Sequence, residues 1–108
     1  MSASTQAGTK PAKKVLIVDD ESENRHILRL LLGREGYNVI EAGSGQEAVE
    51  ATMREQPALI LLDIDMPDLD GYEVCERLKH APRTAAIPVI FLTGMAGAED
   101  IVRGFRVG

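Results

Sequence analysis

The sequence predicts an α/β fold in which a parallel sheet carries helices on both faces. Short apolar runs alternate along the chain with segments whose apolar residues recur at helical spacing. The apolar runs show little alternation of polar and apolar residues, which is typical of strands that are covered on both sides. The length of 108 residues favours a single domain. Together these observations predict a doubly wound sheet with right-handed crossovers.

The first strand and the first helix are expected close to the N-terminus. Residues 15–18 form a wholly apolar run rich in β-branched side chains, which suits a central strand. Ser22 is the predicted N-cap of the helix that follows, and Gly36 is expected to end it. A more polar strand over 37–40 then indicates a position nearer the edge of the sheet.

The second helix and the third strand follow the same alternation. Ser44 and Glu47 have the spacing of a capping box, so a second helix is expected from there to about residue 56. The third strand is the apolar run 58–62, which leads into a loop over 64–70. This third strand is apolar throughout, so the sequence places it in the interior of the sheet.

The last predicted elements repeat the pattern once more. The pair Asp70-Gly71 indicates a turn before a third helix over 72–80. A fourth strand is expected over 89–92 and a fourth helix over 99–107. The alternation therefore ends on a helix.

Composition excludes several classes of function. The 17 acidic and 12 basic residues give a net charge of −5, which argues against nucleic-acid binding. The longest apolar run, 58–62, is too short to span a membrane, and the polar N-terminus does not resemble a signal peptide. We expect residues 1–12 to be a disordered leader. The single cysteine, Cys75, cannot form an internal disulfide, which indicates a reducing compartment, the cytoplasm.

Residues capable of chemistry collect where the strands end. Asp19 and Asp20 follow the first strand, Asp63 follows the third, and Thr93 follows the fourth. The carboxyl ends of parallel strands share one edge, where ligands bind. Three carboxylates brought together there repel one another, and a hard cation such as Mg²⁺ relieves this repulsion. A carboxylate beside Mg²⁺ can also accept a phosphoryl group, and Asp63 is the best-placed nucleophile.

These residues and their surroundings resemble the receiver domain of bacterial two-component response regulators. The matching segments are an apolar strand that ends in Asp19-Asp20, the stretch 61–74 with Met66-Pro67 and Asp70-Gly71, and the stretch 87–94. The resemblance implies a flavodoxin-like, doubly wound parallel sheet with strand order 2-1-3-4-5. It covers residues 13–108, which we interpret as one receiver domain.

The resemblance also implies a role for each matching residue. Asp63 would accept a phosphoryl group from a sensor histidine kinase or a histidine phosphotransfer protein. Asp20 would bind Mg²⁺ directly, and Asp19 would bind it through water. The backbone carbonyl of Asp65 would complete the metal site, and the hydroxyl of Thr93 would turn toward the new phosphate as a switch. Gly94 and Met66 would border the phosphate pocket.

One residue of the family pattern has no counterpart in this sequence. Receivers carry a lysine after a fifth strand, and neither Arg103 nor Arg106 matches it. The resemblance therefore implies strands 1–4 and helices 1–4, with the last strand–helix unit missing, and an output domain beyond Gly108. We expect the polypeptide 1–108 alone to be unstable, or to be completed by another chain at the exposed fourth strand. A homodimer remains open, and no contact with nucleic acid or membrane is expected.

The function implied is that of a signalling module, which changes its own phosphorylation state and is not an enzyme for a separate substrate. Two alternatives fit parts of the pattern. A degenerate receiver that only mediates assembly would agree with the missing lysine, although the intact carboxylates and Thr93 argue against it. The pair Asp63 and Asp65 also resembles the Asp-x-Asp motif of haloacid dehalogenase-type phosphatases, but there the motif opens the domain.

Overall fold

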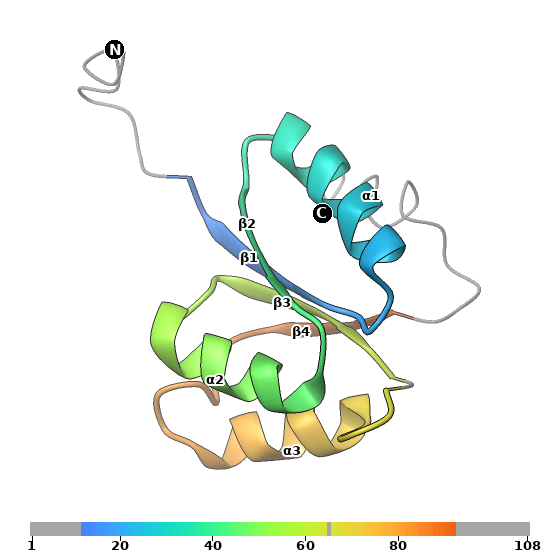
Figure 1. Ribbon diagram of the computed structural model, residues 1–108. Helices are drawn as coiled ribbons and strands as arrows, with labels where there is room; N and C mark the ends of the chain where they lie inside the picture. Colours follow the sequence, from blue (N-terminus) through green and yellow to red (C-terminus); the bar gives the residue numbers. More distant parts are fainter. Residues whose placement is uncertain (1–11, 65, 93–108) are drawn as a thin grey trace.

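A four-stranded parallel sheet forms the centre of the molecule (Figure 1). The computed structural model describes residues 12–64 and 66–92. The strands are β1 (Lys14–Val18), β2 (Asn38–Ala42), β3 (Leu59–Asp63) and β4 (Val89–Leu92). They lie in the order β2-β1-β3-β4, and every neighbouring pair is parallel. The predicted fold class is confirmed, with β1 and β3 inside the sheet and β2 at one edge.

Helices cover both faces of this sheet. Helix α1 (Ser22–Arg34) lies on one face, and α2 (Gly45–Glu55) and α3 (Gly71–His80) lie together on the other (Figure 1). No helix within the described residues is long and apolar enough to cross a membrane. The fourth helix expected over 99–107 and nearly all of the expected leader lie outside the described residues.

The interior strands supply two hydrophobic cores, one for each face. In β1, Leu16 and Val18 pack in the core beneath α2 and α3, whereas Val15 and Ile17 pack in the core beneath α1. All four side chains are almost fully buried. A fully buried side chain of this kind contributes roughly 1.5–3 kcal/mol, which explains why the run has no polar position. The two cores fix β1 between its neighbours and thus fix where its last residues lie.

The start of α1 differs from the prediction. Its N-cap is Glu21, which has an extended backbone and makes no side-chain cap bond, and Ser22 is the first helical residue. The Asp19 carboxylate already accepts a hydrogen bond from the backbone N–H of Glu21, at 2.9 Å. This bond shapes the chain just before the helix, so Ser22 is not the N-cap. The helix stops before Gly36, as expected, where φ is +92°.

The other two helices begin with side-chain caps. Ser44 accepts a hydrogen bond from the backbone N–H of Glu47, but the Glu47 carboxylate binds the N–H of Gly43, one residue before the N-cap. The predicted capping box is therefore only half formed. A complete capping box opens α3, where Asp70 and Glu73 bind each other's backbone N–H groups. The sequence pattern had indicated only a turn at this point.

The ends of three strands also differ by a residue or two from the prediction, and β1 begins at Lys14, one residue before its predicted start. β2 begins at Asn38 and continues to Ala42, because its register with β1 pairs Val18 with Ala42. β3 includes Asp63, which pairs with Leu92 of β4. Asp63 is therefore the final residue of β3, and the loop begins at residue 64, as expected.

Candidate metal centre

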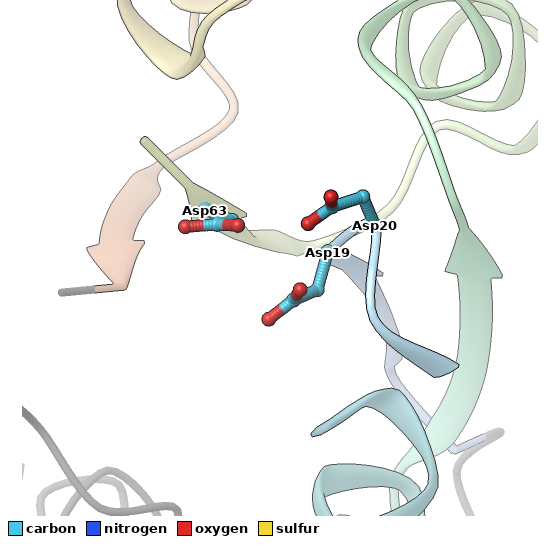
Figure 2. Close-up of side chains that lie close together, drawn as sticks. All are labelled: Asp19, Asp20 and Asp63. Atoms are coloured by element: carbon cyan, nitrogen blue, oxygen red, sulfur yellow. The ribbon is translucent and has the colours of Figure 1, made fainter. Parts of the chain in front are cut away.

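Three carboxylates meet at the carboxyl edge of the sheet. Asp19 and Asp20 follow β1, and Asp63 ends β3. The two strands are neighbours, with Val18 paired to Leu62, so the residues that follow lie side by side. One carboxylate oxygen from each aspartate lies within 4.8 Å of the others, and Figure 2 shows the three side chains gathered there. The structure thus brings together the three acidic residues that the sequence singled out.

The donor set of this cluster suits a small, hard cation. Asp19 is buried, Asp63 is half-buried and Asp20 is exposed, so the cluster is anchored in the fold and open to solvent on one side. Three carboxylates at this separation repel one another unless a cation or proton lies among them. Mg²⁺ prefers oxygen ligands and retains several waters, and the open side provides room for those waters. The residues present therefore fit Mg²⁺.

Hydrogen bonds fix the buried carboxylate of the cluster. One oxygen of Asp19 accepts the backbone N–H of Glu21 at 2.9 Å, and the other accepts Nδ2 of Asn24 at 3.2 Å. The Asn24 amide also donates to the carboxylate of Glu21 at 3.2 Å. Asp19 therefore has an oriented side chain before any cation arrives. Asn24 was not predicted; its place in the first turn of α1, five residues after Asp19, is the signal that could have found it.

The loop after β3 approaches the cluster closely at Gly71. The Gly71 backbone N–H donates to the carbonyl of Ile64 at 2.8 Å. A Cβ at position 71 would lie 2.6 Å from the carbonyl oxygen of Asp63, closer than real Cβ atoms come. Glycine is therefore required here because the start of α3 lies against the backbone of the phosphoacceptor candidate.

The same loop is tied to α2 through Asp68. Its two carboxylate oxygens accept the backbone N–H groups of Gly45 and Gln46, each at 3.0 Å. The hydrogen bond from Gly45, followed by that from Gln46, lowers the pKa of Asp68 to about 2. This side chain provides acceptors for two N–H groups at the start of α2 that have no partner within the helix. It thereby connects that helix to the loop beside the cluster.

The remaining predicted site residues are placed as follows. Met66 is buried in the core beneath α2 and α3, where its neighbours in that core include Leu62 and Val74. Asp65, Thr93 and Gly94 lie outside the described residues. Thr93 comes directly after Leu92, the residue that pairs with Asp63.

Comparison with protein families gives a match over nearly all of this chain. Residues 15–108 match the family model described as the response regulator receiver domain. Over 96 residues the chain is 41% identical to the probable transcriptional regulator ycf27 of Porphyridium aerugineum, covering 89% of this chain and 39% of that protein. It is 39% identical over 95 residues to the response regulator PleD of Caulobacter vibrioides (strain NA1000 / CB15N), covering 88% of this chain and 21% of that protein. The chain thus spans about two fifths or less of these curated relatives.

Solved structures give the same result at the level of the fold. The N-terminal domain of a response regulator receiver protein from Methanoculleus marisnigri JR1 superposes with a TM-score of 0.75 at 39% identity, covering 84% of this chain and 75% of that chain. The signal receiver domain of a signal transduction histidine kinase from Syntrophus aciditrophicus gives a TM-score of 0.73 at 37% identity, covering 90% and 74%. Both structures are similar to this chain well beyond the central sheet.

Proposed function

The chain belongs to the response regulator receiver domain family, and from this premise we propose that it accepts a phosphoryl group on Asp63. The donor is a phosphohistidine of a sensor histidine kinase or of a histidine phosphotransfer protein. The single observation that carries the proposal is the meeting of Asp63 with Asp19 and Asp20 within 4.8 Å at the end of β3. Family membership favours this function over a haloacid dehalogenase-type phosphatase.

The proposed transfer uses Asp63 as the nucleophile. A carboxylate oxygen of Asp63 forms a bond to phosphorus, and the P–N bond to the donor imidazole breaks. The imidazole nitrogen keeps the bonding electron pair, and the product on this chain is an acyl phosphate. Bound Mg²⁺ would neutralise charge on the phosphoryl oxygens. Asp20 and Asp63 would hold that ion directly and Asp19 through water, because Asp19 is buried and already accepts two hydrogen bonds.

Residues on the neighbouring segments complete the proposal. The backbone carbonyl of Asp65 would supply a further metal ligand, and the Thr93 hydroxyl would donate to a phosphoryl oxygen in the switched state. Gly94, which has no side chain, would leave space beside the phosphoryl group. Met66 has a buried side chain, so it would border the pocket through its backbone.

We place this chemistry in a cytoplasmic signalling protein. Since the named relatives are much longer than the part this chain matches, an output domain following the receiver is the natural target of the switch. The names of those relatives include a transcriptional regulator and a response regulator. The receiver itself is expected to contact the kinase or phosphotransfer protein, and a second copy of itself in a homodimer.

Phosphorylation at Asp63 is the test of this proposal. With Mg²⁺ and acetyl phosphate, intact-mass measurement should show one added phosphoryl group that is lost on treatment with hydroxylamine. Asp63→Asn keeps the shape of the side chain but removes the nucleophile, so it should show no added group. Glu76→Gln makes the same chemical change at an exposed position of α3 and should be phosphorylated normally. Labelling that persists in Asp63→Asn, or that maps to a serine or histidine, would contradict the proposal.

A further inference from the structure

The guanidinium of Arg25 joins α1 to the backbone of the acidic cluster. Its Nη1 donates to the carbonyl oxygen of Asp19 at 2.7 Å, and its Nε donates to the carboxylate of Glu41, on β2, at 3.1 Å. The side chain is only 20% exposed. It also lies over Gly43, where a Cβ would come within 3.2 Å of Nη1. Contacts with three segments therefore fix the position of this guanidinium.

The carbonyl that Arg25 holds belongs to the peptide unit between Asp19 and Asp20. A peptide unit is planar, so fixing its carbonyl oxygen also fixes the direction of the Asp20 N–H and the position of its Cα. Asp20 is the exposed member of the cluster, and no hydrogen bond to its side chain is recorded among the described residues. Within the described part of the chain, the direction of its carboxylate toward Asp63 therefore depends on the backbone that carries it.

We propose that Arg25 is a positioning residue for the divalent-cation site, acting through the Asp19–Asp20 peptide, and that Glu41 holds Arg25 in place. The proposal rests on the function proposed above, since it concerns the same site. Groups that orient metal ligands change metal affinity by about 10–100-fold when they are removed. Arg25 makes a charge-assisted bond that is short and partly buried, the class of hydrogen bond with the strongest effect on geometry.

The sign of the effect separates positioning from simple electrostatics. Arg25 carries a positive charge near a cation site, so losing that charge should strengthen Mg²⁺ binding if charge alone mattered. Losing the bond to the Asp19 carbonyl should weaken Mg²⁺ binding if positioning matters. The two explanations therefore predict opposite changes for the same substitution.

Arg29 provides a matched control. Its Nη1 donates to the other oxygen of Glu41 at 2.7 Å, on the same helix, one turn further on. Within residues 12–64 and 66–92, its hydrogen bond and ion pair go to Glu41. Arg29→Met therefore removes a positive charge and an ion pair with the same carboxylate while leaving the Asp19 carbonyl bonded to Arg25. The difference between Arg25→Met and Arg29→Met isolates the contact with the peptide.

The experiment measures Mg²⁺ affinity by calorimetric titration of the unphosphorylated protein. We expect Arg25→Met to weaken Mg²⁺ binding about tenfold, and Arg29→Met to leave it unchanged or slightly stronger. Arg25→Lys, which keeps the charge but loses the planar fork, should fall between the wild type and Arg25→Met. Unchanged or tighter binding by Arg25→Met would overturn the proposal. If Arg25→Met does not fold, wild-type affinity in Arg25→Lys would overturn it.

A second readout in the absence of Mg²⁺ keeps this inference separate from the proposed function. Hydrogen exchange of the Asp19 amide, which donates to the carbonyl of Ala42 at 3.2 Å, reports how firmly the end of β1 is held. It should be faster in Arg25→Met than in the wild type, and unchanged in Arg29→Met. If the wild type binds no Mg²⁺, the proposed function fails. Independently of that result, equal exchange rates in Arg25→Met and Arg29→Met would refute the positioning role of Arg25.

Discussion

The carboxylate of Asp68 shows how a single side chain can make stability depend on pH. It accepts two backbone N–H groups at the start of α2, which lowers its pKa from 3.8 to about 2. Because the folded state binds this proton less readily than the unfolded state, the carboxylate stabilises the fold fully above pH 3.8. That stabilisation is lost as the pH falls through about 2.

Asp68→Ala is therefore expected to destabilise the protein by about 1 kcal/mol near neutral pH, the usual effect of losing a helix cap. The difference in unfolding free energy between wild type and variant should shrink as the pH falls below 3.8. Urea unfolding at a series of pH values measures it. Glu76→Ala, which removes a carboxylate from an exposed position of α3, is the control. If the difference in unfolding free energy between wild type and Asp68→Ala stayed constant down to about pH 2, the Asp68 carboxylate would not be what stabilises the start of α2.

At the residue scale, the acidic cluster could be predicted from the sequence, but the residues that hold it in position could not. Asp19, Asp20 and Asp63 could be predicted because the ends of parallel strands always meet at one edge. Arg25 and Glu41 could not, because their pairing depends on the reach of two long side chains between α1 and β2. No local spacing rule describes a contact between residues 16 positions apart on different elements.

At the element scale, α3 can approach β3 closely because Gly71 has no side chain. Gly71→Ala would place a Cβ 2.6 Å from the carbonyl oxygen of Asp63. Because that neighbour is backbone, the helix or the strand end must shift, and we expect a loss of about 1–3 kcal/mol in unfolding free energy. Chemical denaturation measures this loss.

Gly33 in α1 is the matched control for this substitution, because a Cβ there would have nothing within 4 Å. Gly33→Ala should stabilise the protein by about 0.5–1 kcal/mol, because alanine loses less backbone entropy in a helix. Equal effects of the two glycine substitutions would show that helix propensity, rather than the close approach of α3 to β3, governs position 71.

The order and type of the described elements could be predicted, but several of their ends could not. Apolar runs identified β1 and β3 because burial on both faces tolerates few polar side chains. Caps depend on which donor a side chain reaches. Glu47 bonds to Gly43 rather than to the N-cap residue, and Glu21 rather than Ser22 is the N-cap of α1. Which N–H group a side chain reaches depends on the geometry of the loop before each helix, and the local sequence pattern does not indicate that geometry.

At the scale of the whole molecule, the proposed binding of a cation would be linked to folding. The three carboxylates meet only when β1 and β3 are paired. A cation that binds only the folded state raises its stability, by about 2.7 kcal/mol at 100 times the dissociation constant. Thermal unfolding with increasing Mg²⁺ should therefore show a rising midpoint, and EDTA should reverse it.

Asp20→Ala should respond in two opposite ways. Without Mg²⁺ it should be as stable as the wild type or slightly more stable, because one of three mutually repelling charges is gone. With Mg²⁺ it should gain much less stability than the wild type. A full Mg²⁺-dependent rise in this variant would remove the acidic cluster from the linkage.

The position of β1 also has a consequence during synthesis on the ribosome. Among the described strands β1 is made first, yet it lies between β2 and β3, so one of its edges stays without a partner until β3 has emerged. Roughly 40 residues separate the end of β1 from the start of β3, which takes about 2–8 s at typical translation rates. For that interval an apolar, β-branched segment is exposed in the nascent chain. We expect slowed translation between β1 and β3 to increase the dependence of this protein on chaperones.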